Sequence, residues 1–285
     1  MSGDQILVGY DGSTDAKVAL NWALDEAGRS GRPVRLAYVF EWLTVAGWVG
    51  PGVAPGIWPD ETARRQVEEL VRSAAANAAA DRPGLTVHGE VFDGPPALVL
   101  QERSTEAGML VLGSRGHGGF GGLLAGSTAV SVAAHAHCPV VVVRDGRPAT
   151  SGPVVVGVDG SESSLLALGF AVERAAQRDV PLWVLRVWGP SGERQVPPGA
   201  DPGDTERAAV DQDLAQWRKS FPDVPIEVRV TQGNPAALLV EASREAQLVV
   251  VGSRGRGGLR GMLLGSVSQQ LINHSHCPVA VVRER

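Results

Sequence analysis

The sequence has few of the residues that mark extracellular, membrane or nucleic-acid-binding proteins. Only two of its 285 residues are cysteine, Cys138 and Cys277, so we expect no disulfide framework and a cytoplasmic location. No apolar run is long enough to span a bilayer, and the N-terminal segment lacks the pattern of a secretory signal. The net charge is −5 with the acidic residues dispersed, which argues against the basic face that general nucleic-acid binding requires.

An internal repeat organises the chain. The sequence ILVGYDGS at 6–13 returns as VVVGVDGS at 154–161, an offset of 148, whereas HCPV at 137–140 returns at 276–279, an offset of 139. The second copy is therefore nine residues shorter, and the loss falls within roughly 40–65. Repeats of this length predict two domains, 1–145 and 153–285, joined by a segment of linker composition.

Each copy contains a glycine-rich loop of the same spacing. The first reads GSRGHGGFGGLLAGS at 113–127 and the second GSRGRGGLRGMLLGS at 252–266. Each follows a short apolar run and precedes a helix-like segment. A strand, a glycine loop and a helix N-terminus together favour phosphate binding, because backbone N–H groups and the helix dipole face one point. The chain has only two lysines, Lys17 and Lys219, and neither lies near a loop, so this is not a Walker P-loop.

Short apolar runs alternate with helix-like segments through both copies. Strands are expected near 6–10, 33–40, 85–92, 108–112 and 139–143, and again near 154–158, 181–187, 226–230, 248–251 and 279–282. Helices are expected at 13–29, 60–80, 95–107 and 127–135, and at 161–177, 204–220, 235–245 and 266–273. Strands that are apolar throughout indicate parallel sheets covered on both faces. Ligands of such folds bind beyond the carboxyl ends of the strands, where strand order reverses.

These motifs together carry a family resemblance. The VGxDGS-like segment, the G-x2-G-x9-G-[ST] loop and HCPV, each present twice, resemble the universal stress protein family over nearly the whole chain, especially its tandem, ATP-binding actinobacterial and mycobacterial members. The resemblance implies two doubly wound, Rossmann-like parallel sheets of five strands in order 3-2-1-4-5, with one ATP per domain, with or without Mg²⁺. It also implies a stress-response switch that forms a homodimer and acts on a regulatory protein partner.

The resemblance implies a set of binding residues in each copy. The aspartates would meet the adenosine moiety, the valines of the second strand would line the adenine, and the first glycines would leave room at the strand end. The loop and helix-start residues would hold ribose and phosphates. The first set is Gly9, Asp11, Val39, Gly113, Ser114, Arg115, Gly116, Gly126, Ser127 and Thr128. The second set is Gly157, Asp159, Val187, Gly252, Ser253, Arg254, Gly255, Gly265, Ser266, Val267 and Ser268, where Ser268 would compensate for the hydroxyl lost at Val267.

Simpler explanations compete with several of these assignments. Asp11 and Asp159 are also favoured as plain turn residues. The histidines and cysteines before each final strand are zinc-ligand types, but they lack clear carboxylate or paired-cysteine partners, and histidine is favourable at a helix C-terminus. We therefore predict no metal site at His135, His137 and Cys138, or at His274, His276 and Cys277. Trp42, Trp48 and Trp58 either cap the core of a long loop or form a lid or partner surface.

Catalysis has little support in the sequence. There is no HExxH motif and no Ser-His-Asp spacing, and the candidate base His117 corresponds to Arg256 in the second copy. A binding protein is favoured, and the alternative is a slow ATPase, autophosphorylating or nucleotidyl-transfer enzyme using the same crevice. A partner-binding module with a degenerate pocket is disfavoured because both glycine motifs are intact.

The final strand of each copy raises an assembly question. Both 139–143 and 278–282 are very apolar and should lie at a sheet edge, where an unpaired strand promotes aggregation. We predict that the two domains pack together through these strands about a pseudo-twofold axis. Whole chains would then pair through another surface.

Overall fold

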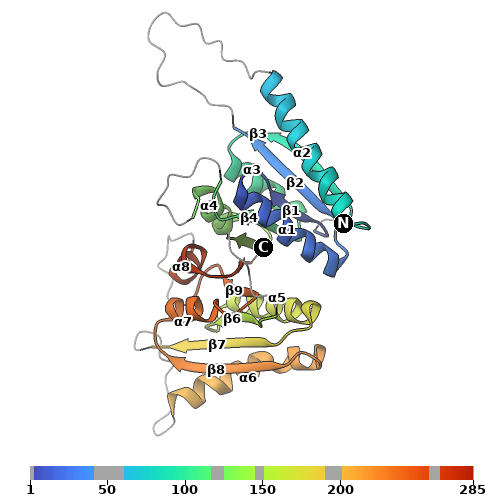
Figure 1. Ribbon diagram of the computed structural model, residues 1–285. Coiled ribbons are helices and arrows are strands. Elements are labelled where there is room, and N and C mark those ends of the chain that lie inside the picture. Colours follow the sequence, from blue (N-terminus) through green and yellow to red (C-terminus); the bar gives the residue numbers. More distant parts are fainter. Residues whose placement is uncertain are drawn as a thin grey trace, which may run out of the picture.

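Figure 1 shows the chain as a computed structural model. The structure describes residues 3–41, 61–116, 125–144, 151–189, 201–256 and 264–284. Its ten strands form one sheet in the order β3-β2-β1-β4-β5-β10-β9-β6-β7-β8. Each half therefore has the predicted order 3-2-1-4-5, with neighbouring strands parallel. The strands are β1 (Ile6–Gly9), β2 (Val34–Phe40), β3 (Val87–Asp93), β4 (Met109–Gly113), β5 (Val140–Val143), β6 (Val154–Val158), β7 (Leu182–Trp188), β8 (Ile226–Gln232), β9 (Leu248–Gly252) and β10 (Val279–Val282).

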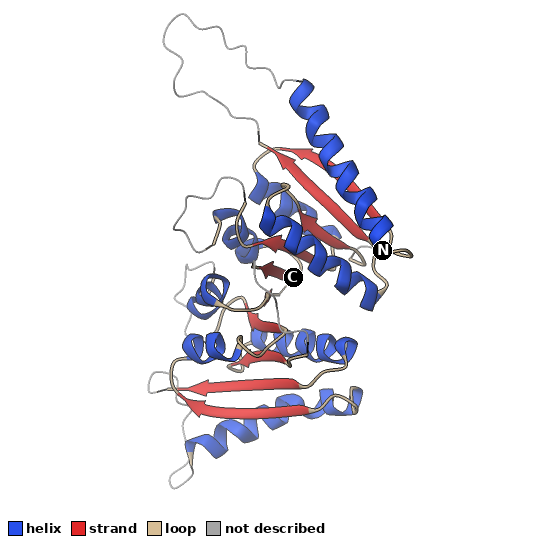
Figure 2. Cartoon of the chain, in the orientation of Figure 1, coloured by secondary structure: helices blue, strands red, loops and turns tan. Residues whose placement is uncertain are grey.

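Helices cover both faces of the sheet, as Figure 2 shows. On one face α1 (Thr14–Ser30), α2 (Glu61–Asp81), α5 (Glu162–Arg178) and α6 (Pro202–Ser220) pack into a continuous apolar core. On the other face lie α3 (Pro96–Arg103), the 3-10 turn η1 (Ser104–Glu106), α4 (Ser127–His135), α7 (Pro235–Ala242) and α8 (Ser266–His274). Successive residues of a strand pack into opposite cores. Ile6 and Val8 belong to the first core, and Leu7 belongs to the second.

The first helix of each half begins where the sequence predicts. The side chain of Ser13 accepts a hydrogen bond from the Ala16 amide, and the side chain of Ser161 does the same for the Ser164 amide. These bonds satisfy a backbone donor that the first turn of a helix would leave unpaired. α1 ends at Gly31, whose φ of 68° is the left-handed conformation that glycine tolerates.

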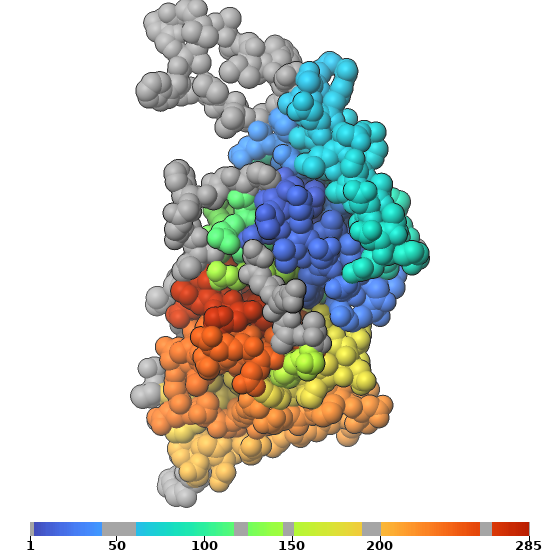
Figure 3. Space-filling model, viewed as in Figure 1, coloured from blue at the N-terminus to red at the C-terminus, as the bar shows by residue number. Residues whose placement is uncertain are grey.

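The two halves join through their final strands. β5 pairs antiparallel with β10, with Val142 opposite Val279, Val141 opposite Ala280 and Val140 opposite Val281. The predicted edge-to-edge packing is confirmed, and it removes two apolar edges at once. In Figure 3 the second half packs directly against the first, with the red C-terminal segment between them.

Two arginines cross this junction in opposite directions. Arg144 follows β5 and donates to the carbonyl oxygen of Asn273 near the end of α8. Arg283 follows β10 and donates to the carbonyl oxygen of Ala134 near the end of α4. Burial lowers the pKa of both guanidinium groups. Each half thus supplies a cation to the C-terminal end of a helix in the other half, where the helix dipole favours positive charge.

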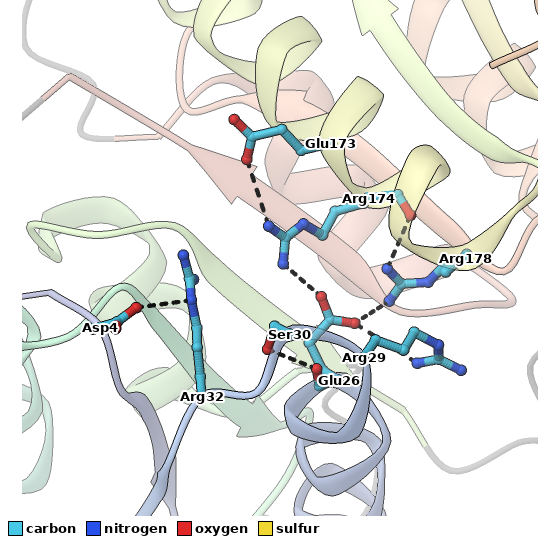
Figure 4. A network of polar contacts seen from close by, with 8 residues as sticks. All are labelled: Asp4, Glu26, Arg29, Ser30, Arg32, Glu173, Arg174 and Arg178. Atoms are coloured by element: carbon cyan, nitrogen blue, oxygen red, sulfur yellow. Dashed lines mark hydrogen bonds and ion pairs between the residues drawn. The ribbon is translucent and has the colours of Figure 1, made fainter. Parts of the chain in front are cut away.

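A buried ion-pair network also links the halves (Figure 4). Glu26 on α1 is fully buried, with Oε1 2.6 Å from Nη1 of Arg174 and Oε2 2.6 Å from Nη2 of Arg178. Both arginines come from α5 and are almost completely buried. Glu26 also lies 3.7 Å from Arg29, and Arg174 lies 3.5 Å from Glu173. The Glu26 carboxylate is therefore shared by the two buried guanidinium groups of α5.

Candidate functional site

A cleft of about 530 Å³ lies at the carboxyl ends of β1 and β4. β1 pairs with β2 on one side and with β4 on the other, so strand order reverses at this point. All ten residues predicted for the first copy line the cleft. The motifs did not identify nine further lining residues, which are Tyr10, Ala16, Ala37, Glu41, Pro96, Leu100, Leu112, Ala125 and Ala129.

A second cavity, of about 590 Å³, lies elsewhere on the first half. It is lined by the ends of α1 and α2 and by the residues that follow them, including Asp25, Arg29 and Arg82. None of the predicted binding residues lines it. Its slightly larger volume therefore does not make it the candidate site, because it lacks the glycine loop and the start of α4.

Neighbouring atoms approach the backbone of Gly113 and Gly116 so closely that a side chain would not fit, and neither glycine has a positive φ angle. A Cβ at Gly113 would lie 2.7 Å from the carbonyl carbon of Asp15, and one at Gly116 would lie 2.6 Å from Oδ2 of Asp11. Near the cleft, positive φ angles occur instead in the turn after the first strand of each half, at Gly12 (84°) and Gly160 (77°). The loop glycines therefore let the segment after β4 rest directly on the start of α1.

Gly9 and Gly157 have a packing role that the sequence did not reveal. A Cβ at Gly9 would overlap Leu112 and approach Leu100, and one at Gly157 would lie 2.8 Å from Leu239. In the first copy both of these leucines line the cleft. Glycine at the end of the strand thus leaves room for leucine side chains that form the apolar wall of the cleft.

The two aspartates after the first strand of each half are turn residues that also meet the glycine loop. Oδ1 of Asp11 accepts from the Ser13 amide at 2.9 Å, and Oδ1 of Asp159 accepts from the Ser161 amide at 2.9 Å. Asp159 also accepts from the Arg256 amide of the second loop at 2.8 Å. Burial would raise the pKa of Asp159, but hydrogen bonds from Ser161, Arg256 and Ser164 bring it below its usual range.

The negative charge of Asp11 affects the pKa values of two tyrosines near the turn. Burial raises the pKa values of Tyr10 and Tyr38, and the Asp11 carboxylate raises them further. Both hydroxyls therefore remain neutral hydrogen-bonding groups at neutral pH.

A buried carboxylate supports the first glycine loop. Oδ2 of Asp15 accepts from the Ser114 hydroxyl at 2.7 Å and from the Arg115 amide at 3.0 Å, and lies 3.5 Å from Arg115 Nε. Ser114 is fully buried, and its hydroxyl holds the loop to α1. The side chain of Arg115 is 52% exposed and remains accessible to an anion. Sequence inspection missed Asp15 because an acidic residue in the first turn of a helix is common.

The start of α4 lies at one end of the cleft, beside the glycine loop. Its N-cap residue is Gly126, which provides no side-chain cap for the first-turn amides. The Gly126 amide donates to the Ser114 carbonyl at 2.7 Å, and this bond holds the helix start against the loop. Ser127 and Thr128 line the cleft from the first turn. Uncapped amides, two hydroxyls and the positive end of the helix dipole form an anion-binding arrangement.

Comparison with known proteins places this geometry in a family. The model of the universal stress protein family matches twice, over residues 3–144 and 151–283. The chain belongs to the universal stress protein family. It is 38% identical to a universal stress protein of Mycolicibacterium smegmatis, covering 98% of this chain and 97% of that protein. It is 37% identical to universal stress protein Rv2623 of Mycobacterium tuberculosis, covering 98% and 96%.

A solved structure shares the whole architecture of this universal stress protein. The crystal structure of a universal stress protein from Archaeoglobus fulgidus matches with a TM-score of 0.75 at 21% identity, covering 99% of this chain and 98% of that chain. At this level of sequence identity, the structural similarity establishes the shared fold alone. Among the helices that the structure describes, none has the length and apolar character needed to cross a membrane.

In the second half of this universal stress protein, different side chains form hydrogen bonds to the glycine loop. Ser163 takes the place of Asp15, and its hydroxyl donates to the Arg254 carbonyl. The Ser268 hydroxyl is buried and donates to the Gly252 carbonyl at 2.7 Å. Its proton therefore holds the end of β9, and Ser268 does not replace the donor that is lost where Val267 stands for Thr128.

The residues before each final strand have ordinary structural contacts. Nδ1 of His135 lies 2.8 Å from the Ser131 carbonyl oxygen, and the His137 amide donates to the Ser104 hydroxyl at 2.8 Å. Within the described ranges, no group of three or more His, Cys, Asp or Glu side chains could hold a metal ion. His117 and the three tryptophans at 42, 48 and 58 lie outside the described residues.

Proposed function

We propose that this universal stress protein binds ATP in the cleft of its first half and acts as a nucleotide-dependent regulatory switch. The observation that carries the proposal is the cleft itself, which has an apolar end and an anion-binding end. Val39, Ala37 and Leu100 line the apolar end, which suits a purine base. The glycine loop and the start of α4 form the other end.

The residues of the anion-binding end have distinct proposed roles. Arg115 would contribute a permanent positive charge to the phosphates, and Ser127 and Thr128 would donate hydrogen bonds from the first turn of α4. Asp11 would meet the adenosine moiety from the turn after β1. Mg²⁺ would accompany the phosphates as a counter-ion, and we assign none of the described residues to it.

The same cleft could serve an enzyme, and turnover separates the two functions. A binding protein releases intact ATP after a long incubation, whereas a slow ATPase or nucleotidyl-transfer enzyme converts it. Among the described lining residues, Asp11 and Glu41 are the carboxylates. We assign Asp11 to the adenosine moiety, and Glu41 directly follows β2, the strand that lines the apolar end. Neither carboxylate is assigned to the phosphates, so we favour binding without turnover.

Titration of nucleotide-free protein with ATP tests the proposal. We expect saturable binding, and Thr128→Val should weaken it by roughly 1.5–3 kcal/mol, because a hydrogen bond to a charged phosphate is lost. Ser131→Ala, one turn further along α4, is the matched control and should leave the affinity unchanged. Absence of saturable binding, or equal affinity in wild type and Thr128→Val, would count against the assignment.

The domain boundaries and the assembly also remain proposals. We propose domains 1–145 and 153–285, each with the universal stress protein fold. We further propose that whole chains form a homodimer and act on a regulatory protein partner in the cytoplasm. Sedimentation velocity at micromolar concentration tests the homodimer, and a single species with the mass of one chain would exclude it.

A further inference from the structure

The helix at the anion-binding end of the first cleft is short. α4 has nine residues, and its start lines the cleft. At about 1.5 Å per residue, its two ends lie roughly 13 Å apart. The N-terminal end presents amides that the Gly126 N-cap leaves without a side-chain partner, and the C-terminal end carries the negative pole of the helix dipole. A charge at the C-terminal end therefore acts on the same short dipole that faces the cleft.

Arg283 of the second half supplies a positive charge to the C-terminal end of α4. It donates a hydrogen bond to the carbonyl oxygen of Ala134, one of the last carbonyls that a helix leaves without an internal partner. The nearby Val132 carbonyl accepts from the Ala136 amide, which belongs to the first half. Arg283 is not a lining residue of the cleft. Its connection to the proposed ATP site therefore runs through α4.

The strand that precedes Arg283 fixes its position. Val282 pairs with Gly252 between β10 and β9, and the Val282 carbonyl accepts from the Ser253 amide at 2.7 Å. A side chain at the end of a paired strand is placed more precisely than one on a free loop. The guanidinium of Arg283 thus reaches α4 from a rigid element of the second half.

The same contact occurs in the reverse direction. Arg144 donates to the carbonyl oxygen of Asn273 on α8, and these two residues are the counterparts of Arg283 and Ala134 at an offset of 139. Of their nine residues, α4 and α8 share only the first and the last. The contact therefore persists although most of the helix sequence has changed.

We infer that Arg283 is a positioning residue for the phosphate-binding end of the first cleft. The inference rests on the proposed function and deepens it, because phosphate affinity in the first half then depends on a residue of the second. The guanidinium offsets the negative pole of α4 and holds its end, so the amides and hydroxyls of the first turn stay directed at the phosphates. The apolar end of the cleft, lined from β2 and α3, does not depend on this contact.

Titration of the full chain with ATP and with adenosine tests this role. The first cleft is identified as the site at which Thr128→Val weakens ATP binding. Arg283→Gln should lower the ATP affinity of that site by about fivefold, because the charge at the end of α4 is lost. The affinity for adenosine, which has no phosphates, should not change. Arg283→Lys keeps the positive charge and should retain most of the ATP affinity.

Two further variants keep the test sharp. Arg283→Met keeps the apolar stem and replaces the glutamine variant if that protein does not fold, with the same expectation. Val141→Ala is the control for a loosened junction, because Val141 pairs with Ala280 and belongs to the core on the sheet face opposite α4. It should lower the stability in urea and leave the affinities for both ligands unchanged.

The outcomes separate this inference from the proposed function. If the glutamine variant binds both ligands as wild type does, or loses ATP and adenosine affinity equally, Arg283 has no positioning role and the inference is overturned. A lysine variant as weak as the glutamine variant would also overturn it, because positive charge would then not be the cause. Failure of the wild type to bind ATP at all would overturn the proposed function itself.

Discussion

Glu26 and Arg174 occupy the same position in the two halves of the repeat and form an ion pair with each other. The offset between them is 148, and Oε1 of Glu26 lies 2.6 Å from Nη1 of Arg174. Pairing two first halves in this way would oppose two glutamates, and pairing two second halves would oppose two arginines. The opposite charges therefore favour association of unlike halves, as in the single chain (Figure 4).

Removing the carboxylate should destabilise the protein strongly. Glu26→Gln leaves Arg174 and Arg178 buried without their shared anion, and loss of one partner of a buried pair costs about 3–5 kcal/mol. Urea unfolding at neutral pH measures this change. Asp25→Ala is a control at the neighbouring position, because its pair with Arg82 is about half exposed and contributes less than about 1 kcal/mol. Equal effects of the two substitutions would show that burial of the network does not matter.

Alanine at the second glycine of each loop should have unequal consequences for ATP binding. In Gly116→Ala the new methyl group would meet Oδ2 of Asp11 and displace the loop from the turn, which should weaken ATP binding by roughly 1–3 kcal/mol. Gly255→Ala creates the same conflict with Asp159, but outside the cleft in which we propose that ATP binds. ATP titration of both variants checks the difference. If Gly255→Ala lowers ATP affinity as much as Gly116→Ala does, the first half is not the principal site.

The hydrogen bonds to Asp159 should make stability depend on pH. They hold the pKa of this carboxyl below its usual range, so their contribution is present above the ordinary aspartate pKa of about 4 and is lost as the pH falls through the folded value. Asp159→Asn should therefore be less stable than wild type at neutral pH, and the difference should shrink in acid. Urea unfolding across this range tests the sign. A difference that is independent of pH would show that the charge of Asp159 contributes nothing.

The cysteine of the second half should be chemically inert in the folded protein. Cys277 is buried, and desolvation raises the pKa of its thiol to about 12, so almost no thiolate forms at neutral pH. In a Cys138→Ser background, iodoacetamide should label Cys277 slowly in buffer and rapidly in urea. Fast labelling of the folded protein would contradict the burial.

The sequence predicted the fold well because its signals are local and occur twice. Ser13 and Ser161 mark helix starts, and the apolar runs mark buried strands, so the helices and strands were predictable from local signals. The strand order followed from the family resemblance. The junction of β5 and β10 was predictable as well, because an apolar edge strand needs a partner.

The remaining features depend on contacts between distant residues. The buried carboxylate of Asp15 meets Ser114 almost a hundred residues later, and Glu26 meets Arg174 in the other half. The hydroxyl of Ser268, expected to serve the second site, is instead committed to a backbone carbonyl.

Nucleotide content tests the central claim most directly. The full-length protein is purified without added nucleotide, a portion is denatured, and the released nucleotide is identified and counted; the rest is stripped and titrated with ATP. We predict that any nucleotide released is ATP, and that stripped protein binds ATP again. Protein that releases no nucleotide and binds no ATP on titration would contradict the account.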